Sequence, residues 1–68
     1  MLFTISINVF GYPMFMSDSA PLGVSDRVEE ATLFNTEKGD NPELKRSYFE
    51  SSIKYHTNQI GRAVITKI

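Results

Sequence analysis

The last third of the chain reads DNPELKRSYFESSIKYHTNQIGRAVITKI (residues 40–68), and it predicts a helix followed at once by a strand. Asn41 is a good N-cap, and Pro42 suits the first helical position, where its missing N–H costs nothing. We therefore expect one main helix over about residues 42–60, packed on a sheet that contains the following strand.

The expected helix carries two apolar groups and one polar face when its residues are spaced at about 100° each. The core stripe is formed by Phe49, Ile53, His56 and Ile60. A second cluster beside that stripe is formed by Leu44, Tyr48 and Tyr55. The residues expected to face away from the core are Arg46, Glu50, Lys54, Thr57 and Asn58.

The segment after the helix is a predicted strand. Gly61 is a typical C-terminal stop for the helix. Residues 62–68 follow it and contain a continuous apolar run at positions 63–65. Because both faces of this strand are partly apolar, we expect it to take a central or covered position in the sheet.

The amino-terminal segment predicts a second strand. Residues 3–9 alternate apolar and polar side chains with a period of two, the pattern of a strand with one buried face. Gly11 and Pro13 end it, and residues 12–25 are expected to form a loop. An apolar cluster in this loop either covers one end of the core or is exposed for binding. Its members are Met14, Phe15 and Met16.

Residues 26–36 fit two structures. Asp26 could cap a helix, with Glu29 three residues later. The alternation of side chains, followed by turn residues after position 36, instead favours a strand, which we prefer. The predicted fold is therefore α+β, with all of residues 1–68 in one small domain. It has a two- or three-stranded sheet and one main helix, in the order β-(β)-α-β.

The length and composition limit how this fold can be stabilised. A domain of 68 residues buries only about 60% of the surface that its unfolded chain exposes. The absence of cysteine excludes disulfides and cysteine-based zinc sites, and one histidine cannot build a histidine-rich site. We expect no cofactor and no metal. The remaining means of reinforcement are a homo-oligomer or docking on a larger protein.

The charges are unevenly distributed along the chain. Residues 1–16 carry none, residues 17–43 hold seven acidic and two basic side chains, and residues 44–68 hold five basic and one acidic. The middle therefore has a net charge of −5 and the end one of +4. Either the two regions neutralise each other across the folded surface, or one of them is a docking patch.

No targeting or membrane segment is predicted. The uncharged start lacks a basic region, and polar residues interrupt its apolar character before the roughly 20 residues that a membrane span needs. The sequence assigns no compartment. The absence of a signal peptide and of cysteine favours an intracellular, soluble protein over a secreted one.

The sequence shows no catalytic constellation, and we expect a protein that is not an enzyme. His56 is the only general base that titrates near neutral pH, and its position on the core stripe predicts a hydrogen-bonded border residue. Ser52 lies four residues before it, but no third orienting group and no oxyanion loop accompany the pair. A lone Gly39 does not make a phosphate-binding loop.

Two binding functions remain. The leading hypothesis is a protein-binding module, a small subunit, linker or inhibitor that docks on a larger protein or assembly. Tyrosine-rich surfaces are typical of such interfaces. The alternative is a small nucleic-acid-binding protein that uses the basic C-terminal third. The predicted partner-binding residues are Leu44, Tyr48, Tyr55, Arg46, Lys54, Met14 and Phe15.

One resemblance agrees with the first hypothesis. The chain resembles the small phycobilisome linker domains in the order of three elements. These are a Leu2-Phe3 strand near the amino terminus, a helix ending at glycine, and a final strand over residues 61–68. That family usually has paired glycines before its last strand, and here Ile60 replaces the first of them. The resemblance covers roughly a third of the chain. It implies a non-enzymatic module that docks on larger proteins.

Overall fold

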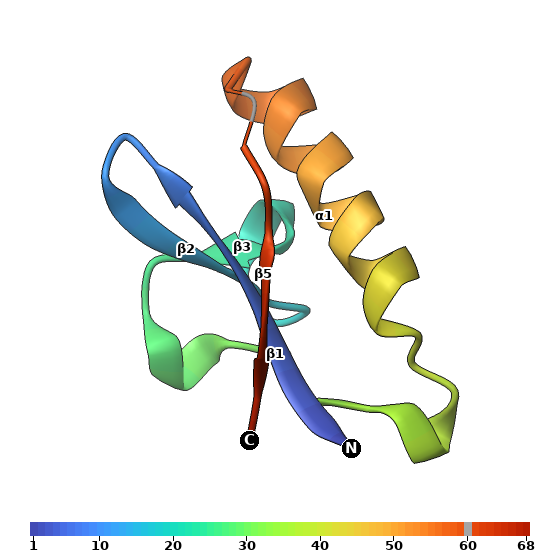
Figure 1. The fold of residues 1–68 in the computed structure, drawn as a ribbon. Coiled ribbons are helices and arrows are strands. Elements are labelled where there is room, and N and C mark those ends of the chain that lie inside the picture. Colours follow the sequence, from blue (N-terminus) through green and yellow to red (C-terminus); the bar gives the residue numbers. More distant parts are fainter. Residues whose placement is uncertain (60) are drawn as a thin grey trace.

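A five-stranded antiparallel sheet with one helix packed against it makes up the fold (Figure 1). The structure is a computed structural model that describes residues 1–59 and 61–68. It confirms a small α+β fold, but the sheet has more strands than the two or three predicted. The strands are β1 (Leu2–Val9), β2 (Tyr12–Met16), β3 (Val24–Ser25), β4 (Phe34–Asn35) and β5 (Val64–Lys67). The helix α1 spans Pro42–Thr57.

Strand β1 is the centre of the sheet. Its Ser6 pairs with both Phe15 of β2 and Val64 of β5, so β2 and β5 lie on opposite edges of β1. Its Phe3 likewise pairs with both β4 and β5. Strands β2 and β4 therefore follow one another along one edge, and β5 alone occupies the other. The prediction that the last strand is central or covered was wrong, because β5 pairs only with β1.

The prediction of a loop over residues 12–25 was wrong for its first part, because β1 and β2 form a hairpin. The two turn residues, Phe10 and Gly11, both have positive φ values, 53° and 84°. Two such residues make the tight turn whose twist matches that of the flanking strands. Pro13 pairs with Asn8, next to the pair that closes the turn, where its nitrogen faces away from β1. A proline is tolerated there because no ladder donor is lost.

Replacing Phe10 by asparagine is expected to raise the free energy of unfolding by about 1 kcal/mol. Asparagine adopts positive φ more easily than phenylalanine does, and Asn-Gly is the preferred pair for this turn. Little packing is lost, since the Phe10 side chain is exposed. Urea denaturation followed by circular dichroism measures the change. A lower stability of Phe10→Asn would contradict the assigned turn.

The strand favoured over residues 26–36 is reduced to β4. Before it, Val28–Glu30 forms one 3-10 turn, and Thr36–Lys38 forms another after it. Polar side chains explain the first turn, because Ser25 Oγ donates to Glu30 Oε1 at 2.6 Å and accepts from the Arg27 amide at 3.1 Å. Side chains that bond to nearby groups in this way compete with a regular ladder.

Helix α1 begins as predicted and ends earlier than predicted. Asn41 Oδ1 accepts from the Leu44 amide at 3.1 Å, which confirms the N-cap. The last helical residue is Thr57, and Asn58 takes the left-handed conformation, with φ 58°. Gly61 is therefore not the stop. Its Cα lies so close to β1 that an added Cβ would sit 3.3 Å from Ile7 Cδ1.

The core lies between β1 and α1. Its buried apolar members are Phe3, Ile5, Ile7, Met16, Phe34, Phe49, Ile53 and Ala63. The helix supplies Phe49 and Ile53, as predicted. The other two members of the predicted helix stripe differ, since His56 is exposed and Ile60 lies outside the described residues.

Candidate protein-binding surface

The side of α1 that points away from the core carries an aromatic ridge, formed by Leu44, Tyr48 and Tyr55. At about 100° per residue these three lie within about 40° of one another and far from Phe49 and Ile53. Their exposed fractions are 70%, 67% and 86%. They were predicted to form a cluster beside the core stripe. The structure instead places them on the solvent side of the helix, so they are not a shoulder of the packing face.

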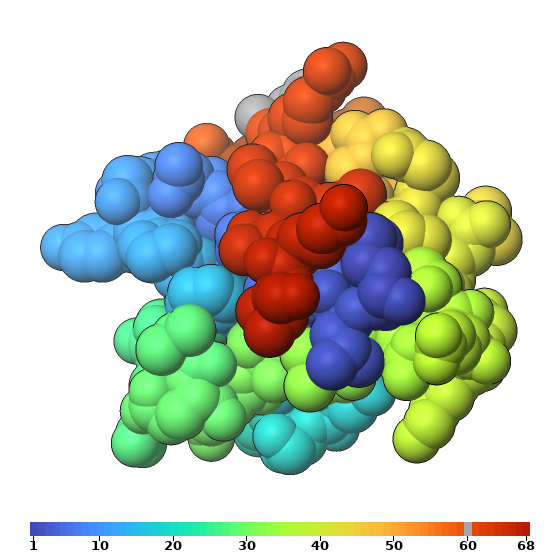
Figure 2. All heavy atoms as spheres, turned by 60° about the horizontal axis from the view of Figure 1, so that its bottom comes forward, coloured from blue at the N-terminus to red at the C-terminus, as the bar shows by residue number. Residues whose placement is uncertain are grey.

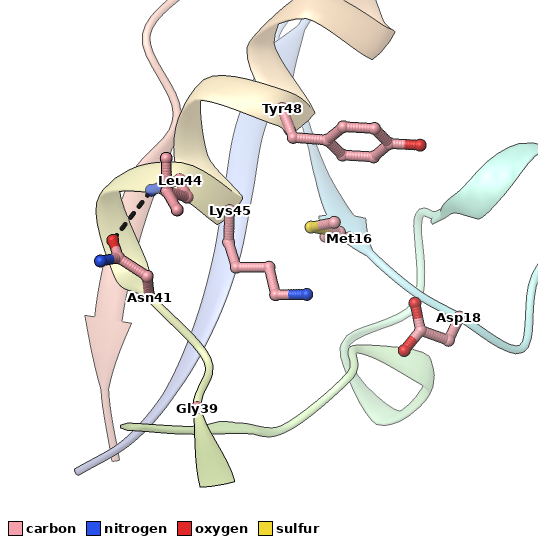
Figure 3. A pocket seen from close by; sticks show the side chains of 7 residues that line it. All are labelled: Met16, Asp18, Gly39, Asn41, Leu44, Lys45 and Tyr48. Carbon is pink, nitrogen blue, oxygen red and sulfur yellow. Dashed lines mark hydrogen bonds between the residues drawn. The ribbon is translucent and has the colours of Figure 1, made fainter. Parts of the chain in front are cut away.

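A groove lies beside the first half of this ridge, between α1 and the segment after β2 (Figure 3). Its volume is about 520 Å³. Met16 of the core reaches its floor, and Leu44 and Tyr48 line the helix side. Asp18 projects from the opposite side. The groove therefore combines an apolar floor with a phenol and a carboxylate at its rim.

A lysine at the groove is held in place by two neighbours. Lys45 Nζ lies 3.7 Å from Asp40 Oδ1 and 5.1 Å from the centroid of the Phe34 ring. Asp40 is itself fixed, because its Oδ2 accepts from the Asn35 amide at 2.9 Å. This places an ordered positive charge in a groove that also holds Asp18. The sequence prediction missed Met16, Asp18 and Lys45 as parts of the surface, although Met16 had been noted in an apolar cluster.

Arg46 lies away from the ridge. Its side chain is half-buried, and it donates to Glu43 at 3.1 Å and to Glu50 at 3.4 Å. The hydrogen bond to Glu43, with the charge of the same carboxylate, raises the pKa of Arg46. The expectation that Arg46 and Glu50 face solvent was wrong. Glu50 Oε2 also accepts from the Ala63 amide at 2.7 Å, so this pair joins α1 to the chain entering β5.

The remaining predicted residues are spread over other parts of the molecule. Lys54 lies on the flank of α1 and borders a shallow pocket with Glu50 and Gly61. Met14 packs against the core and lines an apolar pocket at the β1–β2 hairpin. Phe15 belongs to the opposite face of the sheet and is half-buried. The structure thus brings Leu44 and Tyr48 together at the groove, continues them to Tyr55, and separates the other four.

In the part of the chain that the structure describes, the side chains considered for catalysis or metal binding do not lie together. The ring of His56 lies edge-on against Tyr55, with centroids 5.1 Å apart. No hydrogen bond joins His56 and Ser52 in the structure. Within residues 1–59 and 61–68, no three histidine, aspartate or glutamate side chains are placed to hold a metal ion. In the same residues, the α-helix α1 is too short and too polar to cross a membrane.

Comparison with protein-family models, with curated proteins and with solved structures found no match for this chain. The resemblance to the phycobilisome linker domains therefore rests only on the residues quoted for it above.

Proposed function

We propose that this chain is a non-catalytic protein-binding module, a small subunit, linker or inhibitor that docks on a larger protein through the aromatic ridge of α1. The observation that carries the proposal is the exposure of two tyrosines and a leucine along the solvent side of one helix. Tyrosine offers a large, rigid contact area with a polar tip, and it is enriched at interfaces. An exposed helical stripe of this kind fits a complementary groove or flat patch on a partner.

The groove beside the ridge gives the partner a place for an anchoring side chain. Its floor is the apolar Met16, and its rim offers the Tyr48 hydroxyl, Asp18 and the ordered Lys45. Binding energy concentrates where an apolar anchor fills such a pocket and neighbouring contacts exclude water. We therefore expect the partner to insert an apolar residue beside Tyr48 and to place polar groups at the rim.

The partner can be trapped by crosslinking from the ridge. A chain with a photoreactive phenylalanine analogue at position 48 is irradiated in an extract of its source, and the crosslinked protein is identified and purified. The same analogue at position 12 is the matched control, because Tyr12 is about as exposed as Tyr48 but lies in β2. A partner crosslinked from position 48 and not from position 12 identifies the surface.

The double variant Tyr48→Ala/Tyr55→Ala is expected to bind the purified partner about 100-fold more weakly. Loss of an aromatic anchor in an interface costs about tenfold or more for each residue. Stability should hardly change, since neither side chain is buried within the chain. Calorimetry measures the affinity, and Tyr12→Ala is the control that should retain it. Unchanged affinity in the double variant would show that the ridge is not the docking surface.

Binding to a nucleic acid by the basic C-terminal third is the outcome that would replace this proposal. Two of the five cations in that third, Lys45 and Arg46, already contact carboxylates of the chain. A fluorescent single-stranded oligonucleotide serves as the probe in a salt titration. Phosphate contacts would give a steep logarithmic loss of affinity with salt. We expect no binding at low salt.

A further inference from the structure

Strand β5 has an outer edge whose backbone groups are unpaired. The Ile68 amide donates to Leu2 O at 2.9 Å, which fixes the alternation of the ladder between β5 and β1. Residues 64, 66 and 68 therefore bond to β1, and residues 63, 65 and 67 point their N–H and C=O groups outwards. The Ala63 amide is taken by Glu50 Oε2. Among the described residues, the outward groups of Ile65 and Lys67 have no hydrogen-bond partner.

The features that usually protect such an edge are few here. Strand β5 contains no proline, and Lys67 is its one charged residue. It lies at the front of the molecule in Figure 2, uncovered by other segments. Val64 and Ile68, both on the sheet face opposite the helix, are 56% and 72% exposed. The net charge of −1 produces little repulsion between copies.

We infer that β5 pairs with β5 of a second copy of this chain, in an antiparallel dimer with a two-fold axis at Ile65. An antiparallel strand pair is self-complementary, so one edge serves both copies and the assembly closes. Ile65 exchanges two hydrogen bonds with its equivalent. Ala63 is only 4% exposed, so its carbonyl is not counted as an acceptor for the second copy. The backbone pairing at the axis therefore makes about two hydrogen bonds.

The side chains suit a second copy in this register. Val64 lies opposite the second copy's Thr66, and Lys67 lies opposite its Ala63, so no like charges face each other. The Ala63 amide already binds Glu50, which brings that carboxylate to the edge. Lys67 of one copy therefore approaches Glu50 of the other, and the dimer gains two such attractions across its axis.

The dimer goes beyond the proposed docking function and does not depend on it. The ridge lies on the far side of α1, so both ridges remain free when the β5 edges pair. The dimer then presents two equal docking surfaces on one face, and a partner with repeated sites is held more tightly than by one copy.

Sedimentation equilibrium from low micromolar concentration to about 1 mM tests the pairing. The wild-type chain should pass from monomer to dimer in that range. A synthetic chain with an N-methyl group on Ile65 lacks one outward donor, is blocked sterically at the edge, and should remain a monomer with an unchanged circular dichroism spectrum. The Ile65 amide proton of the wild type should exchange more slowly as its concentration rises.

Two charge variants separate the specific contact from a general charge effect. Lys67→Glu places a carboxylate opposite Glu50 and should weaken the dimer about tenfold or more. Lys38→Glu changes the net charge equally at an exposed site in another part of the chain and should leave the dimer within about twofold. A wild-type monomer at about 1 mM, or a dimer that survives N-methylation of Ile65, overturns the inference. If the dimer were lost in Tyr48→Ala/Tyr55→Ala and in no other variant, the contact between copies would lie on the ridge, and the inference would also be overturned.

Discussion

Replacing Phe3 by alanine is expected to leave the chain largely unfolded at 25 °C. Phe3 is fully buried in the central strand β1, and its ring centroid lies 5.4 Å from that of Phe34. Truncating a buried phenylalanine costs about 3–5 kcal/mol, because transfer energy is lost and a cavity remains. A domain of this size has a total stability of about the same magnitude. Circular dichroism should show the loss of helix and sheet signals together.

Two companion variants make this prediction specific. Phe10→Ala removes the same side chain from an exposed turn, and its free energy of unfolding should stay within about 0.5 kcal/mol of the wild type. Phe3→Leu keeps most of the buried volume and should remain folded with a lower urea midpoint. A Phe3→Ala chain that melts close to the wild type would show that β1 is not the centre of the core.

The elements predicted correctly are those whose signals are local. The alternation over residues 3–9 identifies β1, and Asn41 with Pro42 identifies the start of α1, because each pattern depends only on near neighbours. The β1–β2 hairpin was missed because the local signals at its turn argue against a hairpin. Its turn is Phe10-Gly11 and not Asn-Gly, and Pro13 argues against a strand until its position in the ladder is known.

The orientation of α1 shows what local patterns leave undecided. The helix has two apolar groups, and the stripe predicted for the core does supply the residues that meet the sheet. The sequence does not tell how far the second group lies from the sheet. The structure buries Phe49 and Ile53 and exposes the ridge. Glu50 was assigned to solvent because the helical spacing placed it on the polar face, away from the predicted core stripe. Its partner, the Ala63 amide, is 13 residues away, so only the tertiary structure can show the contact.

Replacing Glu50 by alanine is expected to lower the free energy of unfolding by about 2–3 kcal/mol. The Ala63 amide would lose a charge-assisted hydrogen bond of 2.7 Å. Ala63 is only 4% exposed, so water replaces that acceptor poorly. Arg46 would keep Glu43 but lose its second carboxylate. Urea denaturation monitored by circular dichroism measures the change.

Two substitutions of glutamate by glutamine serve as controls for the Glu50 prediction. Glu50→Gln keeps an acceptor oxygen for the Ala63 amide but loses the charge. Its free energy of unfolding should therefore lie between those of the wild type and Glu50→Ala. Glu43→Gln weakens the other partner of Arg46, which is an exposed side chain, and should change stability little. If Glu50→Ala lowered the free energy of unfolding no more than Glu43→Gln does, the hydrogen bond to Ala63 would not stabilise the fold. In that case β5 would be held by its ladder with β1 and by the packing of Ile65 on the core, without a contribution from Glu50.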